Sequence, residues 1–168
     1  MTAAEGARRT ALRRTTLRRT TLALTFVYLV VLVLVAFWPS PIDRDAGDLV
    51  GSVVGWLQRH GAPWVGYRAI EFGANIALFV PVGLFITILS GAERWWFGLF
   101  VGFAASCTIE IGQLVFLPAR SATINDVVAN TAGAAAGALL AVLMLLALAL
   151  AAAQPAPQHA YRDDYGDE

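Results

Sequence analysis

Four long apolar stretches, separated by short polar connections, are the feature that most limits how this chain can fold. They cover residues 20–38, 72–90, 95–117 and 127–153, and each has the roughly 20 residues that an α-helix needs to cross a bilayer. Hydrophobic residues make up 58% of the chain, well above their share in an ordinary soluble domain. The sequence therefore predicts an all-α integral membrane protein, a bundle of about four transmembrane helices within residues 20–153.

The segment between the first two apolar stretches is predicted to be an amphipathic helix at the membrane interface. On a helix, residues 45–60 present one polar and one apolar stripe. The polar stripe contains Asp45, Asp48, Ser52 and Arg59, and the apolar stripe contains Leu49, Val53, Trp56 and Leu57. Trp64 and Tyr67 follow as expected anchors at the level of the headgroups. A solvated loop with incidental periodicity is the alternative.

The distribution of arginine sets the expected orientation in the membrane. Residues 1–19 form a low-complexity basic arm with six Arg, and such a segment stays in the cytoplasm. Four crossings then return the C-terminus to the cytoplasm, with eight Arg inside and four outside. Residues 154–168 combine Pro with several acids and are expected to form a disordered acidic cytoplasmic tail.

Polar side chains in and beside the predicted spans are the candidate ligand-binding residues. They are Asn75, Glu110, Gln113, Arg120, Asp126 and Asn130. A carboxylate in the bilayer centre costs about 2.5–3.5 kcal/mol on insertion scales, so Glu110 must be shielded, paired, protonated or near the interface. The expected topology brings all six residues to the outer ends of the helices, where they would form a polar pocket. The alternative is that the amides only bond to one another and that Asp126 only caps its helix.

Small residues recur every fourth position on the third and fourth spans. They are Gly98, Gly102 and Ser106 on the third span, and Gly133, Gly137 and Ala141 on the fourth. Such stripes let two helices approach closely, so we expect these two faces to pack against each other, or to join copies in a homo-oligomer.

The residue types expected of a metal or cofactor site are missing from this cluster. Cys107 is the single cysteine, and His60 and His159 both lie outside the candidate site. Two carboxylates without histidine make a poor transition-metal site. No metal, cofactor or nucleic-acid partner is expected, and membrane lipids are the expected partners.

Three motifs in order resemble the VanZ-like family. They are NIALFVPVG from Asn75 to Gly83, the pair Glu110 and Gln113 as E-x-x-Q, and Arg120 followed by DVVANTAGAAAG from Asp126 to Gly137. The positions that match are Asn75, Pro81, Gly83, Glu110, Gln113, Arg120, Asp126, Asn130 and Gly133. The resemblance covers about residues 68–140 and implies a multi-pass protein of the bacterial inner membrane. The family is named for an accessory protein of teicoplanin resistance, so the resemblance also implies an effect on glycopeptide susceptibility.

Three functions remain open from the sequence. The first is a non-enzymatic protein whose outward pocket binds a lipid headgroup or a lipid-linked envelope precursor, with Arg120 on phosphate. The second is an intramembrane enzyme in which Glu110 and Asp126 act as acid and base. The third is a small transporter or assembly factor.

Overall fold

The computed structural model describes residues 3–37, 47–117 and 123–153, and its elements are helices. They are α1 (Ala3–Ala36), α3 (Gly47–Arg59), α4 (Tyr67–Ser90), the short 3-10 helix η1 (Ala92–Arg94), α5 (Trp95–Phe116) and α6 (Ile124–Ala153). Four segments are long and apolar enough to cross a membrane: Thr15–Ala36, Tyr67–Ser90, Ala92–Phe116 and Ile124–Ala153. The prediction of an all-α, four-span protein is confirmed.

The observed helices extend beyond the apolar stretches. α1 begins at Ala3, so the described part of the basic arm continues the first span as a helix. α4 begins at Tyr67 and includes Arg68 and Glu71, and α6 begins at Ile124. Hydropathy marks the part of a helix that suits hydrocarbon, whereas the hydrogen-bonded helix can continue into water.

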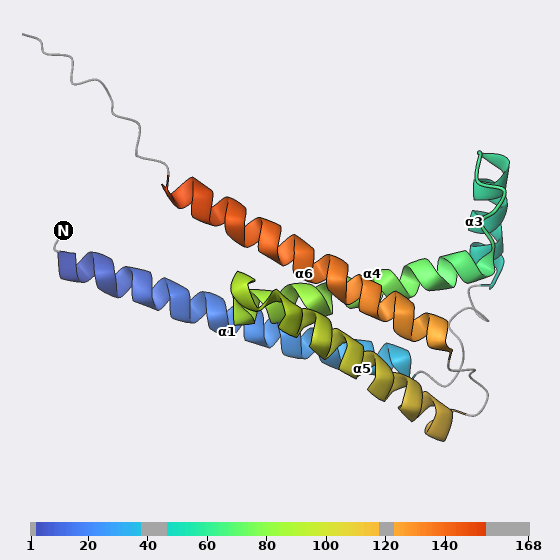
Figure 1. Cartoon of the computed structure of the whole chain (residues 1–168), viewed down its shortest axis with the longest axis horizontal. Helices are drawn as coiled ribbons and strands as arrows, with labels where there is room; N and C mark the ends of the chain where they lie inside the picture. Colours follow the sequence, from blue (N-terminus) through green and yellow to red (C-terminus); the bar gives the residue numbers. More distant parts are fainter. Residues whose placement is uncertain (1–2, 38–46, 118–122, 154–168) are drawn as a thin grey trace, which may run out of the picture.

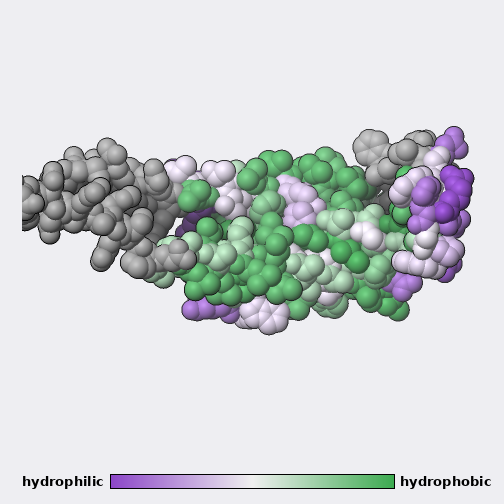
Figure 2. All heavy atoms as spheres, turned by 90° about the horizontal axis from the view of Figure 1, so that it is seen from above, coloured by the Kyte–Doolittle hydropathy of each residue, from purple (hydrophilic) through white to green (hydrophobic). Residues whose placement is uncertain are grey.

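The spans alternate in direction, with α1 and α5 running one way and α4 and α6 the other (Figure 1). The C-terminal ends of α1 and α5 therefore meet the N-terminal ends of α4 and α6 at one end of the bundle. Because α3 crosses this end, we call it the α3 end, and we call the opposite end, with η1, the hairpin end. Figure 2 shows apolar residues over the middle of the bundle and hydrophilic residues gathered at the α3 end.

The closest helix contact joins the parallel helices α4 and α6. A Cβ atom added to Gly137 would lie 1.9 Å from the carbonyl oxygen of Val80, and one added to Gly133 would lie 2.2 Å from that of Ile76. Only a hydrogen atom fits at either position, so the two backbones touch, as small-residue stripes allow in membranes. The expectation that these two glycines face α5 is therefore wrong.

α5 packs on the neighbouring ridge of α6. An added Cβ atom at Gly102 would lie 2.3 Å from the Cβ atom of Ala134 in α6. One at Gly98 would first meet Thr87 Oγ1 in α4, at 2.4 Å, and would lie 3.6 Å from the Cβ atom of Ala138 in α6. The small-residue stripe of α5 thus packs on α6, one ridge away from Gly133 and Gly137, and at Gly98 it packs on α4 as well. Both ridges are built from small residues, so α6 lies between α4 and α5 and contacts each of them closely.

α1 packs at the side of the bundle, against α4 and α5. Leu32 is buried with Phe79, Val82 and Ile109 in the main apolar cluster. The hydroxyl group of Tyr28 donates a hydrogen bond to the carbonyl oxygen of Leu78, close to Pro81 in α4. These contacts fix the second half of α1 to the α4–α5 hairpin.

α3 has the amphipathic character that the sequence predicts. Its apolar residues Val53 and Trp56 remain 43% and 54% exposed, and Trp64, which follows the helix, is 79% exposed. The side chain of Gln58 donates a 2.8 Å hydrogen bond to the carbonyl oxygen of Val65 and folds the connection back onto the helix. Exposed tryptophans beside a membrane span are typical of an interfacial segment.

Candidate functional site

The first turn of α6 is built around Asp126. Thr123 precedes the helix, and its hydroxyl accepts a 3.3 Å hydrogen bond from the backbone N–H of Asp126. The same hydroxyl donates to Asp126 Oδ2 at 2.8 Å. The Asp126 N–H also donates to the backbone oxygen of Thr123 at 3.1 Å. Thr123 therefore caps α6, and Asp126 places a carboxylate in the first turn, where the helix dipole favours negative charge.

Asp126 also joins α6 to α4. Asn75 Nδ2 donates a 2.7 Å hydrogen bond to Asp126 Oδ1, so both carboxylate oxygens accept bonds from the protein. The sequence prediction placed these two residues at the same end of the bundle, and the structure brings them into direct contact. Their bond closes the α3 end of the α4–α6 pair.

One turn further along α6, Asn130 joins this helix to α5. Asn130 is only 5% exposed, and its Nδ2 donates a 2.9 Å hydrogen bond to Ser106 Oγ. Ser106 is fully buried. A polar pair that is this deeply buried holds two helices in one register because breaking it would leave polar groups without partners.

Glu110 occupies the same level of the bundle as Asp126. The α5–α6 contacts pair Gly98 with Ala138, Gly102 with Ala134 and Ser106 with Asn130, and each step moves one turn along both antiparallel helices. One more turn pairs Glu110 with Asp126. Glu110 is 8% exposed, so a carboxyl group is buried at the junction of the helices that carry the other candidate residues.

Gln113 lies one turn beyond Glu110 and faces α1. Its Nε2 donates a 2.9 Å hydrogen bond to the carbonyl oxygen of Ala36, in the last turn of α1. The ring of Phe37 covers Gly112, where an added Cβ would lie 2.6 Å from the ring. Gln113 therefore connects the end of α1 to α5. Its bond is to α1, and not to Asn75 or Asp126.

Arg120 lies outside the described residues, so its predicted contacts with Glu110, Asp126 or a phosphate stay predictions. The other five candidates lie at the α3 end, as expected, and four of them take part in hydrogen bonds between helices or within the α6 cap. The alternative expectation was that these polar groups hold the bundle together. The amide nitrogens of Asn75, Gln113 and Asn130 and the carboxylate of Asp126 do so through these bonds.

Sequence reasoning missed several polar residues of the bundle, one in its middle and two nearer the α3 end. Tyr28 looked like part of an apolar span, and Ser106 was counted only as a small residue. Glu71, which lies one turn before Asn75 on α4, was not considered because it precedes the apolar stretch. Helical spacing could have identified Glu71, whereas the partner of Ser106 depends on the register between helices.

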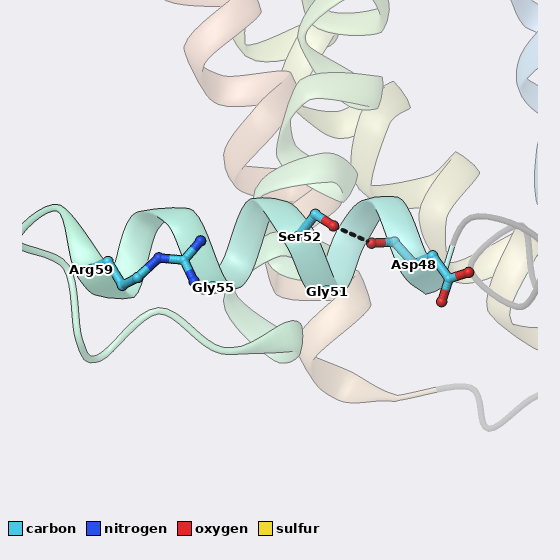
Figure 3. Close-up of a pocket in the computed structure, with 5 residues that line it drawn as sticks. All are labelled: Asp48, Gly51, Ser52, Gly55 and Arg59. Atoms are coloured by element: carbon cyan, nitrogen blue, oxygen red, sulfur yellow. Dashed lines mark hydrogen bonds between the residues drawn. The ribbon is translucent and has the colours of Figure 1, made fainter.

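A separate open groove lies along the polar stripe of α3 (Figure 3). It has a volume of about 500 Å³ and is lined by Asp48, Gly51, Ser52, Gly55 and Arg59. Ser52 Oγ donates a 2.7 Å hydrogen bond to the backbone oxygen of Asp48.

Within the described parts of the chain, no group of three His, Cys, Asp or Glu residues could hold a metal ion.

Comparisons with known proteins agree with the motifs. The family model described as VanZ/LLP1 matches residues 25–146, a range that contains every candidate residue and most of the four spans. No curated protein and no solved structure matches the chain.

Proposed function

This chain belongs to the VanZ/LLP1 family, and we propose that it is a non-enzymatic membrane protein that binds a polar lipid headgroup or an envelope precursor at the α3 end. The observation that carries the proposal is the burial of Glu110, at 8% exposure, beside the polar side chains of α4 and α6. Ionisable groups inside membrane spans are costly and usually serve a function. Hydrogen bonds between helices fix the side chains of Asn75, Gln113 and Asn130 near Glu110, as a preorganised binding site requires.

In this proposal the α3 end faces away from the cytoplasm of a bacterial cell. The support is the arginine distribution expected from the sequence, with eight Arg on the cytoplasmic side of a four-span topology and four on the other side. Arg120, in the connection before α6, would pair with a phosphate of the ligand. The contacts of Gly98, Gly102, Gly133 and Gly137 are within the chain, so homo-oligomerisation through these faces is not part of the proposal.

Cysteine labelling tests the orientation. In a Cys107→Ser background, the exposed residue Asn125 is replaced by Cys at the α3 end, and the exposed residue Glu93 is replaced by Cys at the hairpin end. A membrane-impermeant maleimide added to whole cells should label the Asn125→Cys protein and leave the Glu93→Cys protein unlabelled. The reverse pattern would place the site in the cytoplasm and refute the outward orientation.

The register of Glu110 and Asp126 favours one alternative, acid–base catalysis by these two carboxyl groups. Against it stands the engagement of both Asp126 oxygens, which suits a positioning role better than proton transfer. A Glu110→Gln protein at matched membrane abundance separates the two. Binding should weaken modestly in that protein, whereas a reaction that uses Glu110 as acid or base should be abolished.

The cellular consequence is tested by glycopeptide susceptibility. A deletion strain receives the wild type, Glu110→Gln or Arg120→Ala, and teicoplanin is compared with vancomycin. Restoration by the wild type but by neither variant would connect the polar end to envelope chemistry. If deletion leaves susceptibility unchanged, the resistance role fails, and lipid analysis of the purified protein then tests binding directly.

A further inference from the structure

The described part of the basic arm is a charged helix that extends past the rest of the bundle. α1 is helical without interruption from Ala3 to Ala36, and its N-terminal end and the C-terminal end of α6 both extend beyond the turn between α4 and α5 (Figure 1). The side chains of residues 15–19 are exposed, whereas the apolar cluster that holds α1 begins at Tyr28. The arm contains one acidic residue, Glu5, and six basic residues, Arg8, Arg9, Arg13, Arg14, Arg18 and Arg19.

The contacts between helices give the level of this arm relative to α6. Tyr28 in α1 bonds to the carbonyl oxygen of Leu78 in α4. Gly133 in α6 contacts α4 two residues before Leu78, and Gly137 contacts it two residues after. Tyr28 therefore lies level with about Ala135 of α6. Because α1 and α6 run in opposite directions, each residue towards the N-terminus of α1 is matched by one residue towards the C-terminus of α6 (Figure 1).

This correspondence brings the end of α6 to the level of the arginines. Ala153, the last residue of α6, lies eighteen residues, or about 27 Å, beyond Ala135. Eighteen residues before Tyr28 on α1 is Thr10, which lies between the first two Arg pairs of the basic arm. The chain that follows α6 therefore starts level with the basic arm.

That following chain, residues 154–168, carries the opposite charge. It contains one basic residue, Arg162, and four acidic residues, Asp163, Asp164, Asp167 and Glu168. The ten residues from Ala153 to Asp163 can span at most about 33–36 Å. α4 contacts both α1 and α6, and the axes of packed helices lie about 8–10 Å apart, so α1 and α6 are within about 20 Å where α4 lies between them. The acidic residues can therefore reach the basic arm.

An anionic membrane surface suits this arm less well than the acidic segment does. Along the helix axis, Arg14 and Arg8 lie about 9 and 18 Å before Thr20, where the apolar stretch begins. The headgroup layer is only about 5–7 Å thick on each side of the hydrocarbon, and charges beyond about 8 Å are screened at physiological ionic strength. The five-residue repeat also turns each Arg pair by about 140° from the one before, so the Arg positions surround the helix and form no single face for a flat surface.

We propose that the acidic residues of segment 163–168 dock on the basic arm of the same molecule and so connect the first part of α1 to the end of α6. This contact goes beyond the proposed function and does not depend on the ligand at the α3 end. Arg and carboxylate groups form charge-assisted hydrogen bonds, and a network of several pairs is stable where one exposed pair contributes little. The short covalent connection through Ala153 keeps the acidic segment at a high effective concentration beside the arm.

Disulfide formation between the two segments tests the proposal. In a Cys107→Ser background, Ala11→Cys lies in the basic arm and Gly166→Cys lies among the acidic residues. The full chain is placed in phosphatidylcholine nanodiscs that hold one copy each, and disulfide formation is followed after addition of copper phenanthroline in 0.1 M NaCl. We expect rapid formation within the chain. Ala11→Cys combined with Asn125→Cys, which lies at the α3 end, should give no disulfide.

Neutralising the acidic residues separates docking from chance collision of the two cysteines. The neutral variant combines Asp163→Asn, Asp164→Asn, Asp167→Asn and Glu168→Gln, and it should slow disulfide formation about tenfold, which corresponds to about 1.4 kcal/mol over up to four exposed ion pairs. The arginines are left unchanged because they also influence the orientation of the chain in the membrane. Glu93→Gln, an exposed acid of η1 at the same end of the bundle, is the matched control and should retain the wild-type rate.

Salt and lipid composition decide between charge pairing and its alternatives. In 1 M NaCl the screening length falls from about 10 Å to about 3 Å, so the wild-type rate should fall to that of the neutral variant. Equal rates for the two proteins in 0.1 M NaCl, or a difference that persists in 1 M NaCl, would overturn the proposal. If phosphatidylglycerol in the nanodiscs slows the wild type to the rate of the neutral variant, the membrane surface binds the arm and the proposal is overturned, whereas an unchanged rate supports it.

Discussion

Replacing Gly137 by Ala should separate α4 from α6. The added Cβ would lie 1.9 Å from the carbonyl oxygen of Val80 and 2.8 Å from the backbone nitrogen of Leu84. Ordinary contacts of a Cβ atom begin at 3.4 Å, so this contact must lengthen by about 1.5 Å. Neither obstacle is the end of a flexible side chain, and so the backbones themselves have to move.

The cost of this movement can be estimated from the contacts that it removes. A gap of 0.5–1 Å already forfeits about a quarter to a half of a dispersion contact, and overfilling a packed interface typically costs about 1–3 kcal/mol. We therefore expect Gly137→Ala to lower the free energy of unfolding by about 2–3 kcal/mol. The matched control is Gly73→Ala in α4, where an added Cβ meets nothing within 4 Å. The control should be neutral or more stable by up to about 1 kcal/mol, since alanine favours helix.

Titration of the purified protein in mild detergent with a denaturing detergent, followed by tryptophan fluorescence, measures both free energies of unfolding. If Gly137→Ala unfolds within about 0.5 kcal/mol of Gly73→Ala, the close α4–α6 contact is not present in the protein. A loss in both variants would instead mean that any side chain added to a helix is harmful, and the argument from distance would fail.

Two further predictions concern the helix ends. Thr123→Ala removes the hydroxyl that caps α6 and should lower the free energy of unfolding by about 1 kcal/mol in the same titration. Thr123→Ser should restore most of this loss. An unchanged unfolding midpoint for Thr123→Ala would refute the cap. Gln113→Leu removes the bond to the carbonyl oxygen of Ala36 and should speed amide hydrogen exchange in the last turn of α1. The control is Leu114→Ala, at an exposed position on the same helix, which should leave this exchange unchanged. Equal exchange in both proteins would show that Gln113 does not hold α1.

The number and approximate position of the spans could be predicted because hydrocarbon imposes a length and a composition on each helix. The ends of the helices could not be predicted in this way. Residues 67–71 and 124–126 are helical but are too polar to belong to an apolar stretch. Their helical state depends on hydrogen bonds, such as the Thr123 cap, and on the backbone continuing beyond the bilayer core.

The gathering of Asn75, Glu110, Gln113, Asp126 and Asn130 at one end of the bundle was also predictable, because alternating directions bring the ends of the four spans together. The hydrogen-bonded pairs among these residues could not be predicted from the sequence. Gly133 and Gly137 lie on one ridge of α6, and Asn130 and Ala134 lie on the next, and both ridges are made of small or short residues. Spacing alone cannot say which ridge faces α4 and which faces α5, and so the partners Asn75 with Asp126 and Asn130 with Ser106 depend on three-dimensional packing.

The position of α6 controls both interhelical pairs, and this makes a final prediction. If Gly133→Ala pushes α6 away from Ile76 in α4, the 2.7 Å bond between Asn75 and Asp126 is already weakened in that protein. Asn75→Ala should then cost less in the Gly133→Ala background than in the wild type, with a coupling of about 0.5–1.5 kcal/mol in a double-mutant cycle. Tyr28→Phe, at the seam between α1 and α4, is the control and should be additive with Gly133→Ala. Additive costs for Asn75 and Gly133 would mean that the polar bond and the glycine contact are independent, and that the close approach of α4 and α6 does not set the geometry of the site.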